Sequence, residues 1–371
     1  MARISQIKGA SSRGEFMKRY LIIILSIVIV ISCQKKKEET TTPSTTFQGL
    51  FSMSMNLSAV DASDANYQTE YTAGYNIGMR GAQTVISWCT ENTDFNYAPA
   101  QFLSTNNGYG LTRLSSQGFK ILLTIPIIAI TTKCAPPRVA ADAFNTTAMK
   151  TAYRAFLDQI LPSIDTNVLY VSFGNEVDDY FATHPTEWTA YKELIEDAAS
   201  YVKASKSWVK VGVTTTFKGA SGTHQANVQT LNTNMDVFIL TYYPHPGNFI
   251  MQEPTVVNAD MQTAVTLAGS KPLIYQEFGY PTQTDLNASE AKQWQFFDLG
   301  LSEWKTIGST KIPFLSAFKR RDYFDNIASC STAGTNANKF LCSLGFVTNT
   351  QINKTSWTNI QAKLTSIGLP Y

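Results

Sequence analysis

The chain has 371 residues, of which 44% are hydrophobic and 12% aromatic, and a formal net charge of +2. That is enough apolar material for a large core, and the length fits one large domain or two ordinary ones. The segment through Glu38 holds eight basic and two acidic residues, so the remaining 22 basic and 26 acidic residues make a mildly acidic body, which argues against nucleic acid as a partner.

The N-terminal segment has the pattern of an export signal. Lys18 and Arg19 precede an apolar run, Leu21–Ile31, which predicts a secretory signal peptide and is short for a membrane span. Ser32 before Cys33 resembles the lipobox of bacterial lipoproteins, which implies cleavage before Cys33 and a lipid on its thiol. The protein is then expected on the bacterial cell envelope, at the outer membrane or cell surface. A plain signal anchor with an incidental cysteine is the alternative.

Three parts follow along the chain. Residues 1–33 are the signal peptide with an N-terminal extension, and residues 1–16 of that extension do not fit a signal peptide. Residues 34–46 are polar, with three lysines, two glutamates and several Thr, Ser and Pro, and predict a flexible tether. Residues 47–371 are expected to form one folded domain.

Apolar runs recur in this domain about every 30–50 residues. Most lack an alternation of apolar and polar residues, which is typical of strands buried on both faces of a parallel sheet. The eight runs are Gly49–Met55, Thr84–Trp88, Lys120–Ile128, Val168–Phe173, Val209–Thr215, Val237–Thr241, Leu273–Gln276 and Ile312–Phe318.

Helical periodicity lies between several of these runs. The helices are expected at Met149–Leu161, Thr186–Lys206, Gln252–Ala268 and Asn287–Lys305, the last with Asn287 as a possible N-cap. A strand followed by a helix, eight times, predicts an α/β fold of one closed (β/α)8 barrel, the TIM barrel. Leu344–Val347 and Thr355–Trp357 are expected to cap it.

A doubly wound open sheet is the alternative fold. It usually carries a glycine-rich phosphate loop after the first strand. Here that position reads Phe51-Ser-Met-Ser-Met-Asn56, so the barrel is favoured.

Two strands deliver a glutamate at their C-terminal ends. Val168–Phe173 runs into Gly-Asn-Glu176, and Leu273–Gln276 runs into Glu277. Functional side chains of such barrels lie at these strand ends, and a carboxylate there is costly to bury without a role. Because two carboxylates flanking one bond are the groups that hydrolyse glycosides, the pair predicts a sugar-binding cleft.

The same residues carry a family resemblance. Phe173-Gly-Asn-Glu176 and Gln276-Glu-Phe-Gly279 resemble the retaining β-glycoside hydrolases of the large (β/α)8 superfamily. The resemblance implies that Glu176 is the acid/base, that Glu277 is the nucleophile and that Asn175 holds the sugar 2-hydroxyl. It implies no cofactor.

Two further segments resemble endo-β-1,4-galactanases and one family of β-mannanases. They are Leu240-Thr-Tyr-Tyr-Pro244 and Glu277-Phe-Gly-Tyr-Pro281. In those families a tyrosine bonds the nucleophile, and we assign this role first to Tyr242 and second to Tyr243. Those families also carry an arginine near the end of strand two, where this chain reads Val85-Ile-Ser-Trp-Cys89.

Several other side chains are candidates for sugar contacts. Trp88 either stacks on a sugar or covers the barrel mouth. His245 and Asn56 are candidate hydrogen-bonding partners of the sugar. Lys319-Arg320-Arg321 either binds an acidic sugar, replaces the missing positive charge, or is a solvated charge run, which we favour slightly. Arg80 is expected in the helix before strand two.

Cysteines beyond Cys33 favour disulfides in an exported protein. We predict Cys89–Cys134 and Cys330–Cys342, one of three possible pairings. A metal site is weakly supported, because the chain has three histidines and no CxxC.

The sequence therefore predicts a monomeric glycosidase that hydrolyses β-linked polysaccharide or oligosaccharide by double displacement. Because the strand-two arginine is missing, a catalytically weak or inactive barrel that serves as a surface carbohydrate-binding lipoprotein is the alternative. Transglycosylation would use the same residues.

Overall fold

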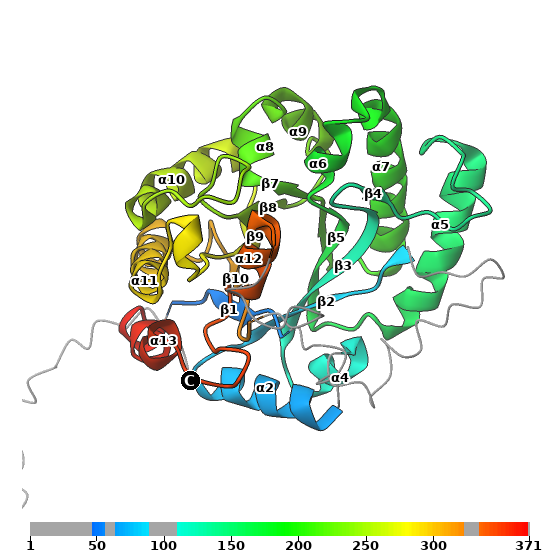
Figure 1. Cartoon of the computed structure of the whole chain (residues 1–371). Helices are drawn as coiled ribbons and strands as arrows, with labels where there is room; N and C mark the ends of the chain where they lie inside the picture. The colour runs from blue at the N-terminus through cyan, green and yellow to red at the C-terminus, as the bar shows by residue number, and fades with distance from the viewer. Residues whose placement is uncertain (1–46, 56–63, 89–109, 323–333, 370–371) are drawn as a thin grey trace, which may run out of the picture. The chain divides into compact units, whose positions relative to one another are not determined.

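The computed structural model describes residues 47–55, 64–88, 110–322 and 334–369. These residues form a (β/α)8 barrel, as the sequence predicts, with the strands at the centre and the helices around them (Figure 1). The predicted signal peptide, the tether, Asn56, Cys89 and Cys330 lie outside the described residues.

Parallel strands make up the wall of the barrel. They are β1 (Leu50–Met53), β2 (Gly81–Val85), β3 (Lys120–Ala129), β5 (Val168–Asn175), β6 (Lys210–Gly212), β7 (Thr214–Thr216), β8 (Phe238–Tyr242), β9 (Leu273–Phe278) and β10 (Phe314–Ala317). β4 (Thr132–Lys133) is a short antiparallel addition to β3. Every predicted strand is present, and the second begins and ends three residues earlier than expected.

Two hydrogen-bonded sheets close into the barrel. Their strand orders are β1-β10-β9-β8-β7 and β2-β3-β5-β6. Val213 alone separates β6 from β7, so these two strands occupy one position in the wall. At the other junction the Arg80 amide donates to the Phe51 carbonyl at 3.1 Å, which joins β2 to β1. The wall therefore has eight strand positions.

Helices follow the strands and cover the outside of the barrel. They are α2 (Asp64–Asn76), α4 (Leu111–Ser116), α5 (Thr147–Ile160), α6 (Val177–Phe181), α7 (Trp188–Ser205), α8 (Phe217–Ser221), α9 (Gln225–Leu231), α10 (Val257–Ala268), α11 (Glu290–Ile307) and α13 (Thr355–Ser366). One further helix, α12 (Asn336–Cys342), lies over the strands at the centre of Figure 1 instead, and its Phe340 contacts Tyr243 at the end of β8. Short 3-10 turns lie at Leu161–Ser163, Pro185–Glu187, Pro254–Val256 and Thr284–Leu286.

Two details differ from the expectation. Ser289, not Asn287, is the N-cap of α11, and its hydroxyl accepts from the Lys292 amide at 3.1 Å. Asn287 instead adopts a left-handed conformation, which Asn tolerates well because of its short polar side chain. The C-terminal helix α13 packs against α11 in the outer ring rather than over the end of the barrel.

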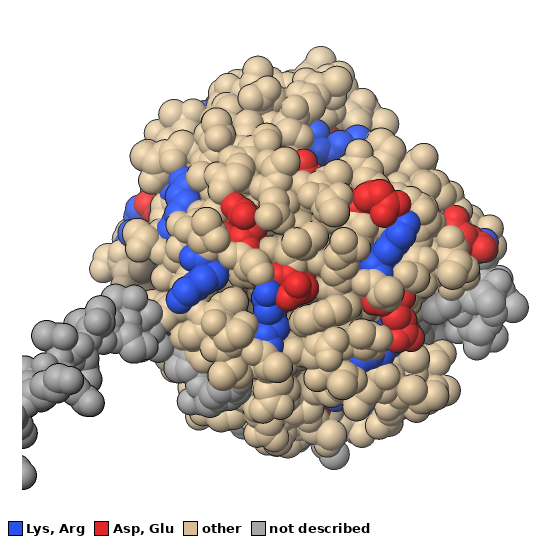
Figure 2. Space-filling model, turned by 90° about the vertical axis from the view of Figure 1, so that its left-hand side faces the viewer, with Lys and Arg blue, Asp and Glu red and all other residues tan. Residues whose placement is uncertain are grey.

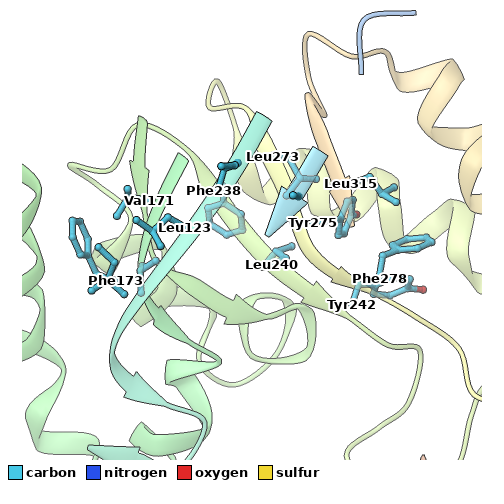
Figure 3. Packing of buried hydrophobic residues seen from close by; sticks show 14 of the residues in the cluster. Leu123, Val171, Phe173, Phe238, Leu240, Tyr242, Leu273, Tyr275, Phe278 and Leu315 are labelled. Atoms are coloured by element: carbon cyan, nitrogen blue, oxygen red, sulfur yellow. The ribbon is translucent and has the colours of Figure 1, made fainter. Parts of the chain in front are cut away.

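Side chains on the outer face of the strands pack against the helices. Figure 3 shows Leu123, Phe173, Leu240, Tyr275 and Leu315 among them. A second apolar cluster forms from side chains of alternate strand positions, and it fills the lower interior of the barrel. It contains Leu122, Tyr170, Val237, Ile239, Ile274 and Phe314. Period-2 alternation thus separates the two apolar layers.

A polar layer lies above the interior apolar cluster. Gln83 on β2 donates to the Ser316 hydroxyl on β10 at 3.0 Å, although β1 lies between those strands. Thr124 on β3 likewise donates across the barrel to Gln276 on β9, at 3.2 Å. Because these bonds join strands that are not neighbours, they pass through the interior. A barrel core of this type is usually filled by branched apolar side chains.

Buried ion pairs tie the last strand to the first helix. Glu70 of α2 accepts hydrogen bonds from Arg320 and Arg321, which follow β10, and the Arg321 contact measures 2.8 Å. The three residues are 2%, 9% and 7% exposed. The expectation of a solvated charge run at 319–321 is therefore wrong, because these arginines are committed to a buried carboxylate.

The surface over α10, α11 and α13 has basic and acidic side chains interspersed on a mostly uncharged face (Figure 2). Within the described residues, no helix combines the length and apolar character needed to span a membrane. Cys134 and Cys342 are buried. Their pairing with Cys89 and Cys330 stays a prediction, because those partners are not described.

Replacing Glu70 by Gln should destabilise the fold by about 3–5 kcal/mol, since it leaves two buried guanidinium groups without their carboxylate. Chemical denaturation of the variant and the wild type measures this change. Glu253→Gln is the matched control, because Glu253 pairs with Lys292 at the surface and its loss should leave stability nearly unchanged. Equal effects of the two substitutions would contradict a structural role for the Glu70 pairs.

Candidate active site

Glu176 lies directly after β5, at the C-terminal end of the barrel. Gly174 makes this turn possible, since a Cβ there would lie 2.3 Å from Val177 and 2.6 Å from the Tyr191 hydroxyl. Glu176 itself adopts a left-handed conformation, φ 52° and ψ 45°, which costs a non-glycine residue on the order of 1 kcal/mol. The turn directs the carboxylate toward the barrel mouth, where Thr241 bonds it.

A β-bulge at the end of β9 presents two consecutive polar residues to the interior. Leu240 pairs with Tyr275, but the next residue, Thr241, pairs with Glu277, so Gln276 is an extra residue. A bulge of this kind re-aims side chains that alternation would send to opposite faces. Gln276 and Glu277 therefore both reach the centre of the barrel.

Gln276 connects the two glutamate-bearing strands. Its amide nitrogen donates to the Oδ1 atom of Asn175, the residue before Glu176. Its carbonyl oxygen accepts from Thr214 at 2.5 Å and from Thr124 at 3.2 Å. Because Gln276 is buried and its carbonyl and amide groups are both bonded, it fixes the Asn175 amide relative to β9.

Each carboxylate has its own hydroxyl donor from the end of β8. Thr241 donates to Oε1 of Glu176 at 2.6 Å, and Tyr243 donates to Oε2 of Glu277 at 2.6 Å. Thr241 lies opposite Glu277 on the neighbouring strand. One strand end therefore bonds both glutamates, which places the two carboxyl groups in one site.

The first choice of tyrosine was wrong. Tyr242 points outward, is 1% exposed, and donates to Asp260 of α10 at 2.7 Å. Tyr243 holds Glu277, as the second choice predicted. Alternation along β8 could have separated them: Ile239 lies in the interior cluster and Thr241 bonds Glu176, so Tyr243 shares their face.

The two carboxyl groups have unequal surroundings. Burial raises the pKa of Glu176, and the neighbouring charge of Glu277 raises it further, while Thr241 opposes the rise. Burial also raises the pKa of Glu277, but the Tyr243 hydroxyl and the charge of Lys319 both oppose that rise. The environment thus favours a proton on Glu176 and a negative charge on Glu277.

Lys319 belongs to this site. It follows β10 and is 1% exposed. The sequence had assigned it either to an acidic sugar, to a replacement for a missing positive charge, or to solvent, and its burial excludes the solvent-exposed reading.

The segment around β2 contributes fewer side chains to the site than the sequence predicts. Trp88 is fully buried against Tyr153 and Phe156, so it has no free face for a sugar and packs between the barrel and α5. Val85, at the end of β2, is 48% exposed. Arg80 lies between α2 and β2, and its guanidinium bonds carbonyls of Tyr75 and Met79. No residue of β2 brings a positive charge to the glutamates.

His245 stands in an aromatic group beside Tyr243. Its ring stacks on the ring of Phe249, with 4.9 Å between the ring centres. The ring of Phe340 contacts the rings of His245, Phe249 and Tyr243. Burial lowers the pKa of His245 to about 4, with a further contribution from the charge of Lys218. The imidazole is therefore neutral at pH 7, and its role as a sugar hydrogen-bonder stays a prediction.

Across the described part of the chain, no cluster of three or more His, Cys, Asp or Glu side chains is placed to hold a metal ion. The chemistry that the site offers is that of two coupled carboxyl groups, a tyrosine hydroxyl, an amide and a lysine.

Comparison with protein-family models and with curated proteins finds no match. Solved structures are similar in fold. GH5_18 from Streptomyces cattleya, in complex with GlcNAc, has a TM-score of 0.65 and 10% identity, over 87% of this chain and 81% of that one. The exo-beta-1,4-mannosidase Op5Man5 from Opitutaceae bacterium strain TAV5 has a TM-score of 0.62 and 12% identity, over 87% and 61%.

A family 39 glycoside hydrolase from Bacteroides cellulosilyticus WH2 is also similar, with a TM-score of 0.60 and 12% identity, over 84% of this chain and 62% of that one. At these identities the likeness establishes the barrel fold. What the site does has to be argued from its own residues.

Tyr243→Phe should raise the pKa of Glu277 by about one unit, because it removes a hydrogen bond to the charged form. Carbon-13 NMR of protein labelled at the glutamate carboxyl measures this, and the Glu277 signal is the one lost in Glu277→Gln. Tyr242→Phe is the control, since Tyr242 bonds Asp260 instead. The geometry would be contradicted if Tyr242→Phe shifted the Glu277 titration and Tyr243→Phe did not.

Proposed function

We propose that the protein is a retaining glycoside hydrolase that cleaves β-linked polysaccharide or oligosaccharide. The observation that carries the proposal is the unequal carboxyl pair at the barrel mouth, Glu176 at the end of β5 and Glu277 at the end of β9. Such a pair divides the work of glycoside hydrolysis, because one group has to be protonated while the other is charged.

In the first step the carboxylate of Glu277 attacks the anomeric carbon and forms a glycosyl ester. The bond to the leaving oxygen breaks, and Glu176 transfers its proton to that oxygen. In the second step Glu176 takes a proton from water, the resulting hydroxide attacks the anomeric carbon, and Glu277 is released as a carboxylate. The sugar leaves with its original anomeric configuration.

Coupling between the carboxyls supports this division of roles. The charge of Glu277 raises the pKa of Glu176 in the free enzyme, so Glu176 holds the proton that the first step needs. The glycosyl ester of Glu277 is neutral, which removes that influence. The pKa of Glu176 then falls, and a group that was an acid becomes a base for the second step.

Asn175 is proposed to hold the sugar 2-hydroxyl beside Glu277. Its Oδ1 atom already accepts a hydrogen bond from Gln276. The amide nitrogen of Asn175 is therefore the group proposed to donate to the sugar 2-hydroxyl. His245 and the aromatic side chains around it are proposed to contact sugar further along the cleft.

Two neighbours by fold are named for β-linked mannosides: one is an exo-beta-1,4-mannosidase, and the other is a GH5_18 variant in complex with Manb1-4GlcNAc. They support a β-linked substrate for this chain, and a β-mannoside is the first to test. We also propose that Cys33 carries a lipid that anchors the enzyme to the cell envelope.

Glu277→Gln should lower turnover of β-linked polysaccharides and aryl β-glycosides by more than about a thousandfold, since it removes the nucleophile. Glu176→Gln should lower it strongly on substrates with poor leaving groups and less on activated aryl glycosides, which need little protonation. Proton NMR of the first product identifies its anomer. An inverted product, or full activity of Glu277→Gln, would rule out the double displacement.

Folded wild-type protein that binds the sugars without turning them over would instead favour the carbohydrate-binding alternative. Isothermal titration with the same panel separates these results, and thermal melting of each variant shows whether its fold is intact.

The pH dependence of kcat/KM should be bell-shaped. Activity falls as pH drops through the pKa of Glu277, which must be ionised, and falls again as pH rises through the pKa of Glu176, which must be protonated. Burial raises both pKa values, so the acid limb should lie above the ordinary value of 4.5. An acid limb at or below 4.5, measured with an uncharged substrate, would contradict the environment described for Glu277.

A further inference from the structure

We propose that Lys319 is a positioning residue that keeps the Glu277 carboxylate ionised and fixed from the side of β10. The inference rests on the proposed function, since it concerns the nucleophile of that site. It assigns to a lysine after the last strand the positive charge that β2 does not supply.

The backbone places Lys319 at the level of Glu277. β10 lies beside β9, with Ala317 paired to Phe278, and the Phe318 amide donates to the Phe278 carbonyl at 3.0 Å. The chain then passes close to β9, because a Cβ on Gly279 would lie 2.8 Å from the Phe318 carbonyl oxygen. Lys319 therefore enters the barrel mouth from the strand next to the one that carries Glu277.

The ammonium group of Lys319 lies near the aromatic side chain of Phe318, which is itself a neighbour of Tyr243. The Nζ atom lies 5.9 Å from the centre of the Phe318 ring. That ring lies 6.3 Å from the ring of Tyr243, whose hydroxyl bonds Glu277 at 2.6 Å. The lysine is 1% exposed, so its charge acts on nearby groups with little screening by water.

The charged neighbours of Lys319 have separate partners. Arg320 and Arg321 bond Glu70. Asp322 accepts from the Nζ atom of Lys354 and the amide of Gly345, each at 2.8 Å. Lys319 acts on Asp322 as well as on Glu277, but Asp322 already has a bonded cation.

Within the described residues, β2 brings no arginine or lysine to Glu277, and the groups whose electrostatic influence links them to Glu277 include Glu176, Tyr243 and Lys319. Tyr243 and Lys319 both favour the charged form of Glu277, whose charge in turn raises the pKa of Glu176. The charge of Lys319 lowers the pKa of Glu277. Tyr243 supplies direction by a hydrogen bond and Lys319 supplies charge, so the two act on the nucleophile in different ways.

The test is a titration of Glu277 by carbon-13 NMR of carboxyl-labelled glutamate in wild type, Lys319→Met and Lys319→Arg. Lys319→Met should raise the pKa of Glu277 by about one unit or more, because an opposite charge nearby lowers a carboxyl pKa by roughly that amount. Lys319→Arg should keep the wild-type value to within a few tenths of a unit. The acid limb of kcat/KM should shift by the same amount and in the same direction.

Lys218→Met is the matched control. It removes one positive charge from α8, at the loop that carries His245, without altering the groups that face Glu277. It should leave the Glu277 titration in place. If Lys319→Met does not fold, Lys319→Gln provides a second neutral variant.

Three results would overturn the inference. One is an unchanged Glu277 titration in a folded neutral variant at position 319. Another is an equal shift in Lys218→Met. The third is a rise in KM confined to acidic substrates with the titration unchanged, which would assign Lys319 to the substrate. Because the titration needs no turnover, an inactive wild type would reject the proposed function and still decide the role of Lys319.

Discussion

Two carboxyl groups share the mouth of this barrel, and they cannot both carry an unopposed negative charge in a site that is largely shielded from water. The rest of the site answers that constraint. Tyr243 and Lys319 favour the charge on Glu277, and Thr241 gives Glu176 a single hydroxyl donor. The asymmetry comes from the strands themselves, because β8 supplies both hydroxyls and the segment after β10 supplies the lysine.

The polar layer beneath the two glutamates holds the neighbouring side chains in fixed positions. Below the glutamates, Gln276 is bonded to Asn175, Thr124 and Thr214, so residues from β3, β5, β7 and β9 meet at one side chain. A core of this kind forgoes some apolar burial. It holds the amide of Asn175 in one orientation, because the Gln276 amide nitrogen donates to it while the Gln276 carbonyl oxygen is held by Thr124 and Thr214.

Much of the fold and part of the site can be predicted from the sequence. Eight buried runs with helices between them give the barrel, and a glutamate at the end of two strands gives the pair. Burial alone does not separate Tyr242 from Tyr243, since both faces of a barrel strand are buried; only alternation counted from a residue of known face does. Only the polar Thr241 marks the inner face. The bulge at Gln276 was also invisible, because it appears only as a shift in pairing between β8 and β9. A run of three charged residues such as Lys319, Arg320 and Arg321 suggests a solvent-exposed segment. The arginines are buried because they pair with Glu70, which lies 250 positions before Arg320.

That separation has a consequence for how the chain is made. β1 pairs with β10. The ion-pair partners of Glu70 are two arginines that are synthesised much later than Glu70 itself. Chains fold from the N-terminus during synthesis at about 5–20 residues per second, so the carboxylate of Glu70 stays in water for roughly 10–50 s before its partners emerge. The first βα unit therefore completes its buried ion pairs only after the last strand has emerged. Closure of the barrel is a late event that joins both ends of the domain at once, and the lysine beside Glu277 arrives in the same step.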